Sequence, residues 1–259
     1  YYHMRKLPFL FLALAFVACK KEVAKKTEHK EEKSEWIQLL DEENSKNWRA
    51  YKGKGLPPGW TINDGVLKFD TELKSEDEYT GGTDVVYGGQ EFDNFEFYVE
   101  WKIPKGCNSG IFYHINEAYK LPQYSAPKYQ IIDDFNYADM FDLTAYNTSV
   151  GFENPSQLHP LQKTASDYAM YAADAEKKKM NPIGEWNSTK IVFTPQNVEY
   201  WLNGEKVLSF VPWSDDWNKR KAAGKWDDAK AYGTYKTGLI GFQDHNGPIS
   251  FKNAKIKQL

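Results

Sequence analysis

The sequence predicts an all-β fold, an antiparallel β-sandwich with two short inserted helices. About ten short runs of strand-forming residues are separated by frequent turns, a pattern typical of sandwiches. Between residues 95 and 103, apolar and polar side chains alternate, as expected for a strand with one buried face. Aromatic residues make up 16% of the 259 residues, and strands favour them.

Residues 1–19 have the organisation of a secretory signal that ends in a lipobox. Arg5 and Lys6 precede an apolar run at residues 7–16, which is too short to span a membrane as a helix. The run leads into Val17-Ala18-Cys19, a small residue followed by the cysteine that a bacterial lipobox requires. We expect lipidation at Cys19 and a protein anchored by acyl chains in the bacterial cell envelope.

Residues 20–35 predict a disordered charged tether, because they are rich in lysine and glutamate and almost lack apolar residues. The β-sandwich domain is expected at residues 36–259. Its clearest turns are Asp64-Gly65 and Asn203-Gly204, two-residue signals for hairpins over residues 59–69 and 198–210. Further strands are expected at residues 36–40, 83–87, 108–115, 129–133, 189–193, 237–244 and 249–259.

Two segments have helical composition, residues 166–180 and residues 214–223, and Ser214 is a suitable N-cap for the second. Residues 135–160 form a long polar stretch without periodicity, which in a compact domain is usually functional or disordered. The net charge of −3 includes no basic stripe, so nucleic-acid binding has no support. With Cys19 in the signal region, Cys107 is unpaired, and we expect a buried thiol.

The stretch 238–247 carries the strongest candidate for proton transfer. Side chains alternate along a strand, so Gln243 and His245 point to one side while Ile240 and Phe242 pack into the core on the other. A histidine beside an amide suits a sugar or a transferable proton. The alternative is a surface histidine in a hairpin turn.

Residues 91–96 resemble the Glu-x-Asp-x-x-Glu signature of laminarinase-type glucanases, which would use Glu91 and Glu96 as paired carboxylates. Asp93-Asn94 is turn chemistry, however, and the strand is expected to begin at Phe95. Glu91 and Glu96 would then lie on either side of a bend. The glucanase interpretation therefore stays an alternative.

Five further motifs occur in a fixed order along the chain, namely 108–114 (NSGIFYH), 129–134 (YQIIDD), 184–187 (GEWN), 200–204 (YWLNG) and 243–247 (QDHNG). Together they resemble the 3-keto-disaccharide hydrolase family, whose members are bacterial secreted proteins and lipoproteins with a concanavalin-like jelly-roll fold. The resemblance extends from about Trp36 to Leu259. Family members commonly have a glycine directly after the last histidine, where this chain has Asn246.

The resemblance implies a hydrolase or lyase acting on 3-keto-glycosides, including 3-keto-disaccharides, at the concave face of a sheet. A ketone at C3 acidifies the hydrogen on C2, so a base can remove it and the C1 substituent can leave. Such a site needs a base near neutral pKa, a donor for the enediolate oxygen and an acid for the leaving group. A non-catalytic carbohydrate-binding module of the same fold is the alternative.

Three residues are candidates for the catalytic work. His245 is the expected general base or acid, and His114 is a second candidate base with an equally plausible structural role. Asp133 is a second acid or base, or a metal ligand. No cofactor is firmly implied, although a divalent ion could sit among Asp133, Asp134 and a histidine. Two adjacent acids are more often a solvated turn, and we assign no metal ligand.

Four residues are candidates for binding the sugar. Asn108 and Gln130 are expected to donate to sugar or enediolate oxygens. Trp201 could present its flat face to a sugar ring. Gln243 lies beside His245 and either contacts substrate or orients that ring. A carbohydrate and the membrane are thus the partners that the sequence predicts.

Overall fold

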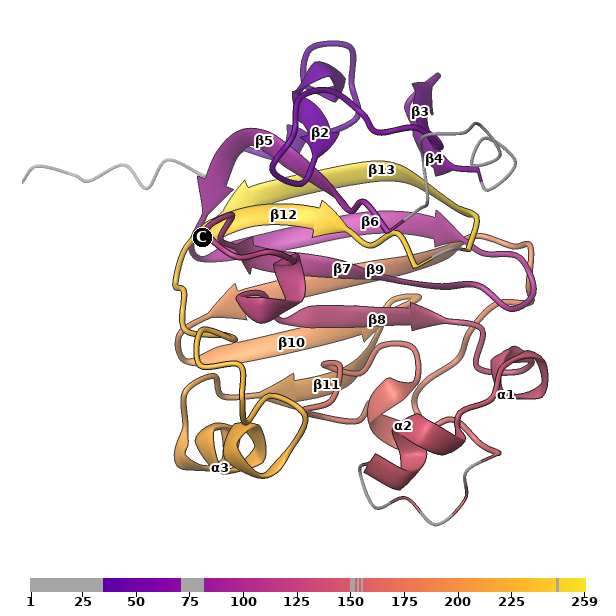
Figure 1. Ribbon diagram of the computed structural model, residues 1–259. Helices are drawn as coiled ribbons and strands as arrows, with labels where there is room; N and C mark the ends of the chain where they lie inside the picture. Colours follow the sequence, from indigo (N-terminus) through magenta and orange to yellow (C-terminus); the bar gives the residue numbers. More distant parts are fainter. Residues whose placement is uncertain (1–34, 71–81, 150–151, 153, 155, 246) are drawn as a thin grey trace, which may run out of the picture. The chain divides into compact units, whose positions relative to one another are not determined.

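The computed structural model describes residues 35–70, 82–149, 152, 154, 156–245 and 247–259 (Figure 1). The predicted signal peptide, Cys19 and nearly all of the charged tether lie outside these residues. Within the described part of the chain, no helix is long and apolar enough to cross a membrane.

Two antiparallel sheets confirm the predicted sandwich (Figure 1). The larger sheet has the order β11 (Glu205–Phe210), β10 (Asn197–Leu202), β9 (Asn187–Thr194), β6 (Phe95–Lys102), β13 (Ile249–Gln258), β4 (Val66–Phe69) and β3 (Trp60–Asn63), with β1 (Ile37–Gln38) beside β13. The smaller sheet has the order β2 (Trp48–Ala50), β5 (Val85–Phe92), β12 (Gly238–Phe242), β7 (Asn108–Ile115) and β8 (Lys128–Ile132).

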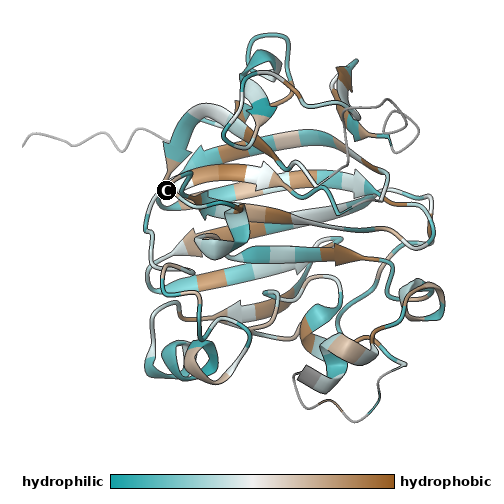
Figure 2. Cartoon of the chain, viewed as in Figure 1, coloured by the Kyte–Doolittle hydropathy of each residue, from teal (hydrophilic) through white to brown (hydrophobic). Residues whose placement is uncertain are grey.

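The core between the sheets is aromatic. Phe242 of the smaller sheet stacks on Phe251 of the larger one, with 3.8 Å between ring centres, and on Trp48 at 4.9 Å. Ile240 is fully buried with it, as the alternation along β12 predicts. Apolar and polar residues alternate along many of the strands in Figure 2, so the larger sheet buries one face and exposes the other.

Both predicted two-residue hairpin turns are present. Asp64 and Gly65 have φ of 49° and 72°, and Asn203 and Gly204 have φ of 49° and 83°. Positive φ at both central residues is the turn geometry that matches the twist of paired strands. These turns connect β3 to β4 and β10 to β11.

One predicted helix is confirmed and one is wrong. Helix α3 (Asp215–Ala223) begins where expected, and the hydroxyl of Ser214 accepts a hydrogen bond from the Trp217 N–H at 3.2 Å. Residues 166–180 form turns and isolated bridges instead of a helix. Ala169 has a φ of 62°, a left-handed conformation that interrupts any right-handed helix there.

The irregular segment predicted at residues 135–160 contains two short helices, α1 (Tyr137–Met140) and α2 (Thr144–Ser149). The remaining single turns are 3-10 helices, η1 (Ser45–Asn47), η3 (Pro122–Tyr124) and η4 (Pro160–Gln162). The described part of residues 137–171, called the covering segment below, lies across the outer face of the smaller sheet, so that β7 and β8 are buried on both faces.

A buried hydrogen-bonded chain ties both sheets to this covering segment. The hydroxyl of Tyr113 in β7 lies 2.9 Å from that of Tyr200 in β10, and Tyr200 donates to Asp167 Oδ1 at 3.0 Å. Asp167 also forms β-bridges with Tyr129 and Tyr171. Burial raises the pKa of Asp167 to about 8, so this carboxyl is mostly neutral at pH 7.

Candidate active site

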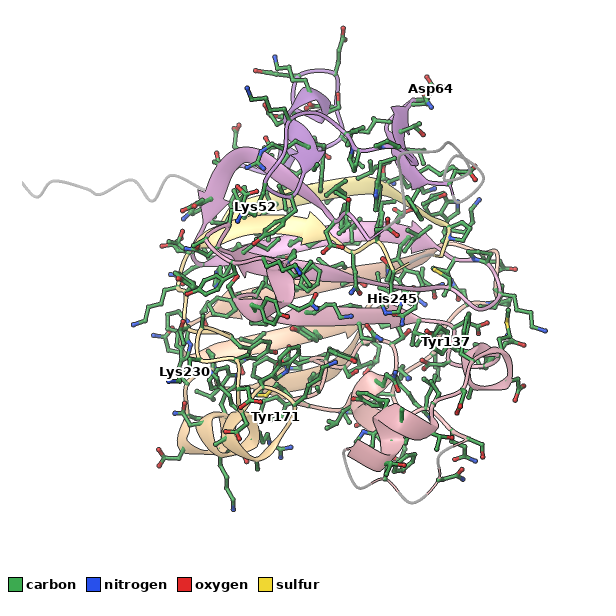
Figure 3. The ribbon with its side chains drawn as sticks, in the orientation of Figure 1. Lys52, Asp64, Tyr137, Tyr171, Lys230 and His245 are labelled. Atoms are coloured by element: carbon green, nitrogen blue, oxygen red, sulfur yellow. The ribbon has the colours of Figure 1, made fainter. Side chains whose placement is uncertain are left out.

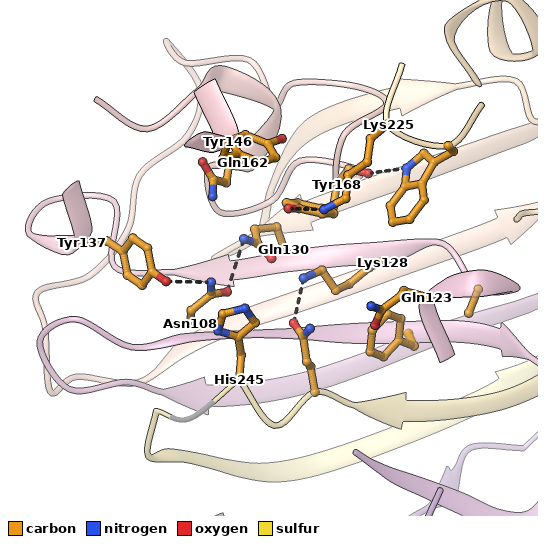
Figure 4. Close-up of a pocket in the computed structure, with 14 residues that line it drawn as sticks. Asn108, Gln123, Lys128, Gln130, Tyr137, Tyr146, Gln162, Tyr168, Lys225 and His245 are labelled. Carbon is orange, nitrogen blue, oxygen red and sulfur yellow. Dashed lines mark hydrogen bonds between the residues drawn. The ribbon is translucent and has the colours of Figure 1, made fainter. Parts of the chain in front are cut away.

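A pocket of about 260 Å³ lies on the outer face of the smaller sheet, and two of its lining residues, Tyr137 and His245, are labelled in Figure 3. Strands β7 and β8 and the residues after β12 supply its floor. Five polar side chains from these elements line it, namely Gln243 and the four labelled in Figure 4, Asn108, Lys128, Gln130 and His245. The sequence predicted four of these five residues, all except Lys128, and the structure brings the four together.

The covering segment and the loop after α3 supply the opposite wall of the pocket. Tyr137 comes from α1, Tyr146 from α2, Gln162 from η4 and Tyr168 from the segment held by Asp167. Lys225 and Trp226 come from the loop after α3. The wall is therefore built from pieces that lie far apart in the sequence.

The strand geometry explains why Lys128 and Gln130 both face the pocket. They are two residues apart on β8, so they share one face of the sheet. Gly110 on β7 lies directly opposite Gln130. A Cβ atom at Gly110 would approach Lys128 Cδ to 2.5 Å, so only glycine leaves space for the lysine stem.

Lys128 is the most unusual group in the pocket, since it is a lysine that is only 5% exposed. Its ammonium donates to Gln243 Oε1 at 2.7 Å and lies 4.3 Å from the centre of the Tyr168 ring. Burial, and to a lesser extent the charge of Lys225, lowers the pKa of Lys128 to about 7. The amine can therefore exchange a proton near neutral pH.

His245 lines the pocket, and the residue as a whole keeps contact with solvent. Shielding of part of the ring from water by neighbouring atoms, reinforced by the charge of Lys128, lowers its pKa below 6.5. The imidazole is therefore mostly neutral at pH 7 and can accept a proton.

Buried hydrogen bonds fix the turn that carries Gln243 and His245. The Gln243 N–H donates to the Gly110 carbonyl at 2.9 Å, and Ser109 Oγ donates to the Gln243 carbonyl at 2.8 Å. One residue on, the Asp244 N–H donates to Asp84 Oδ1 at 2.8 Å. Burial raises the pKa of Asp84 to about 7. Gln243 and His245 thus flank Asp244, whose backbone N–H is anchored to Asp84.

The amide side chains of Gln130, Asn108 and Gln162 are among those that supply hydrogen-bonding groups to the pocket. Gln130 Nε2 donates to Asn108 Oδ1 at 3.4 Å, and Asn108 Nδ2 donates to the Tyr137 hydroxyl at 3.3 Å. Among the described residues, Gln130 Oε1 and Gln162 Oε1 are buried and have no hydrogen-bond partner. A buried acceptor is costly unless it is paired, so both oxygens suit the hydroxyl groups of a bound sugar.

Asp133 does not line the pocket. Its buried carboxylate accepts hydrogen bonds from the backbone N–H groups of Gly106 at 2.8 Å, Phe135 at 3.0 Å and Asn136 at 3.1 Å, and from the Asn136 side chain. Asp134 pairs with Lys178. Asp133 therefore holds the turn that leads into α1. Within the described residues, no group of three His, Cys, Asp or Glu side chains is arranged to hold a metal ion.

His114 and Trp201 also lie away from the pocket. His114 packs in the core against Phe193, with 4.4 Å between ring centres, and its Nε2 lies 2.8 Å from the Asp93 carbonyl oxygen. Burial lowers its pKa to about 4. Trp201 lies on the outer face of the larger sheet, under the ammonium of Lys190 at 3.9 Å. Their predicted catalytic and binding roles have no place in this pocket.

The two glutamates of the glucanase alternative are on different sheets. Glu91 is in β5, and Glu96 is in β6, where it pairs with Lys257 at 2.8 Å. The bend expected at Asp93-Asn94 does separate them, because β5 ends at Phe92 and β6 begins at Phe95. Neither glutamate lines the pocket.

Several pocket residues have no counterpart in the sequence-based candidate list. Lys128 carried a usable signal, because a charge in the fully buried strand Lys128–Ile132 shares a face with Gln130. Gln162 and Lys225 come from segments for which the sequence indicated no element, and Tyr168 comes from residues 166–180, which were predicted to be a helix and form turns and bridges instead.

The fold and the pocket together define a jelly-roll protein with a small polar cavity suited to a carbohydrate. Residues 35–257 match the sequence model of the 3-keto-alpha-glucoside-1,2-lyase-like domain, and the chain belongs to this family of glycoside-cleaving enzymes. It is 32% identical over 244 residues to a 3-keto-disaccharide hydrolase of Bacteroides thetaiotaomicron, covering 86% of this chain and 78% of that protein.

Solved structures agree with this assignment. A protein of Parabacteroides distasonis described as a candidate glycosyl hydrolase is 36% identical and superposes with a TM-score of 0.72, over 86% of this chain and 94% of that one. A second structure from the same organism, with the same description, has a TM-score of 0.59 at 21% identity, over 87% of this chain and 100% of that one, and supports the fold alone.

The structural role of Asp133 can be separated from a catalytic one. In Asp133→Asn, an N–H₂ group replaces one acceptor oxygen and faces donors, so we expect a loss of about 1–3 kcal/mol in the free energy of unfolding. Denaturant titration measures this loss, with the exposed Asp139→Asn on α1 as a control. Turnover per folded molecule should stay within about twofold of the parent protein. Unchanged stability with abolished turnover would instead make Asp133 catalytic.

Proposed function

We propose that this enzyme cleaves 3-keto-glycosides by removing the proton on C2, with His245 as the base and Lys128 as the group that stabilises the resulting enolate. The observation that carries the proposal is the placement of a neutral imidazole and a buried amine in one small polar pocket. Family membership and the activity named for the Bacteroides relative support the substrate class.

The chemistry needs no group from outside the pocket except water. The imidazole takes the C2 proton, and the C2–H electrons form a C2=C3 double bond while the C3 oxygen becomes an enolate. The enolate oxygen then re-forms the C3 carbonyl, the electrons of the C2=C3 bond form a C1=C2 bond, and the C1–O bond to the leaving group breaks. The leaving oxygen takes a proton, which the protonated imidazole can return. Addition of water across C1=C2 afterwards would make the net reaction a hydrolysis.

Lys128 suits the enolate because an oxyanion is stabilised most by a fixed donor in a site with little water. The ammonium is held between Gln243 and the face of Tyr168, so its position is set before substrate binds. A developing negative charge beside it raises the lysine pKa again, which keeps the proton on the amine at the moment of reaction.

The amides suit the rest of the sugar ring. Gln130 Oε1 and Gln162 Oε1 are buried acceptors for sugar hydroxyls, and Asn108 presents an amide between Gln130 and Tyr137. Gln243 contacts Lys128 directly, so it orients the amine more than the imidazole.

Replacing either reacting group should abolish most turnover. For His245→Ala we expect a loss of about 10²–10⁴ in kcat, the usual contribution of a general base. For Lys128→Met we expect a loss of about 10²–10³, because the stem is kept and the charge is removed. Release of the leaving group from a methyl or aryl 3-keto-glucoside is the measurement. Lys206→Met, on the larger sheet, is the matched control.

Two outcomes would contradict the proposal. Full activity in both variants would remove His245 and Lys128 from the chemistry. A parent protein that binds oxidised and ordinary glycosides yet turns over neither would be a carbohydrate-binding module.

The pH dependence of kcat/KM follows from the two pKa directions. His245 must be neutral, and its pKa lies below 6.5, so activity rises with pH below that value. Lys128 must be protonated, and its pKa is about 7, so activity falls as the pH rises through about 7. We therefore expect a narrow bell-shaped dependence of kcat/KM on pH. In Lys128→Arg, whatever activity remains should lose the alkaline decline, because guanidinium stays charged. An alkaline limb that stays in place would exclude Lys128 as its source.

We also propose that the enzyme works at the bacterial cell envelope, held by a lipid on Cys19. The support is the order of charged, apolar and small residues before Cys19. In a bacterial host that processes lipoproteins, Cys19→Ser should abolish incorporation of labelled palmitate and shift the protein from the membrane fraction to the soluble fraction. Equal labelling of both proteins would refute this attachment site.

A further inference from the structure

A second cavity borders the candidate active site. Its volume is about 620 Å³, and α2, η4 and the end of α3 contribute to its walls. Tyr146 and Lys225 line both cavities. The two cavities therefore meet at a shared boundary.

The size of the first pocket makes this neighbour relevant. Ligand pockets for drug-sized molecules are roughly 300–1,000 Å³. At about 260 Å³, the first pocket is large enough for one sugar ring and too small for a whole disaccharide. The part of a glycoside beyond the oxidised ring must therefore lie outside it, and the second cavity offers the larger space.

The shared boundary consists of aromatic faces and one amine. The Tyr146 and Tyr168 rings are 6.5 Å apart and inclined by 24°. The Lys225 ammonium donates to the Tyr168 hydroxyl at 2.9 Å and lies 5.5 Å from the Tyr146 ring centre. Flat aromatic faces with polar atoms at their edges are typical surfaces for sugar rings and aryl groups.

The far walls combine apolar and polar groups. Leu161, Ala169 and Ala223 supply small apolar contacts, and His159 supplies a ring nitrogen. The His159 ring is held in place because its Nδ1 accepts from the Leu161 N–H at 3.1 Å and the ring forms a T-shaped contact with Phe152, with 4.8 Å between ring centres. A cyclic group with both an apolar face and hydroxyl substituents matches this lining.

We propose that the second cavity is the leaving-group site, which receives the ring attached to C1 of the 3-keto sugar, either a second sugar or an aryl group. The inference rests on the proposed function of the first pocket. It makes Tyr146 and Lys225 the residues that the glycosidic bond passes, and it makes the end of α3 a determinant of which glycosides are cleaved.

The test fills the second cavity from the end of α3. Ala223 is exposed at the end of α3, so Ala223→Trp can place an indole in the cavity without a buried replacement. Ala222→Trp adds the same side chain one residue earlier, at an exposed position that does not line the cavity. We measure kcat/KM for a 3-keto-disaccharide, an aryl 3-keto-glucoside and a methyl 3-keto-glucoside.

For Ala223→Trp we expect the ratio of kcat/KM for either large substrate to that for the methyl substrate to fall about 10-fold or more. Ala222→Trp should leave the ratio at the parent value. A fall for only one of the two large substrates shows which kind of ring the cavity receives. A ratio that Ala223→Trp leaves unchanged for both overturns the inference.

A second measurement does not depend on turnover. Glucose and 4-nitrophenol, as free leaving groups, are titrated into the parent protein and both variants and followed by NMR. We expect at least one of them to bind the parent protein and Ala222→Trp, and to bind Ala223→Trp about 10-fold more weakly. Absence of binding to the parent, or equal binding to all three proteins, contradicts the leaving-group site. Binding without turnover of any 3-keto-glucoside would instead remove the proposed function.

Discussion

The site depends on one buried hydrogen-bonded chain, from Tyr113 through Tyr200 to Asp167. It joins the two sheets through their tyrosines and attaches the covering segment to both. Tyr168 follows Asp167 directly, so the same chain sets the aromatic face that lies against Lys128. A carboxyl can occupy this position because burial keeps it mostly neutral at pH 7, which avoids the cost of an unpaired charge in the core.

Lys128 illustrates how backbone geometry determines chemistry. The absence of a side chain at Gly110 admits the lysine stem, and the two-residue spacing along β8 brings Gln130 to the same face. The covering segment then removes the amine from water, which lowers its pKa. A surface lysine would remain fully charged, whereas this one changes its protonation state near neutral pH. The sheet supplies the position of the group, and the covering segment supplies its reactivity.

Local sequence signals predicted the sandwich and the floor of the site well. Alternation indicated β6 and β12, and the turn pairs Asp64-Gly65 and Asn203-Gly204 indicated two hairpins, because these patterns depend on neighbouring residues alone. Alternation also indicated His245, and family resemblance then indicated Asn108 and Gln130. The resemblance also drew attention to Asp133, whose carboxylate is occupied by backbone N–H groups that only the folded chain brings to it.

The remainder could not be predicted because it depends on contacts between distant segments. Helical composition at residues 166–180 gave way to turns, a bridge with β8 and a bridge within the segment, and no local pattern specifies which loop residues will cover a sheet.

The shared wall of the two cavities has a consequence for how such enzymes diversify. The buried lysine on the floor is supplied by a paired strand, whereas the second cavity is lined by α2, η4, the end of α3 and the loop residues beside them. Loops tolerate insertions and replacements that strands do not. A lineage could therefore exchange the lining around α2 and α3 to accept new glycosides while it inherits the reaction centre unaltered.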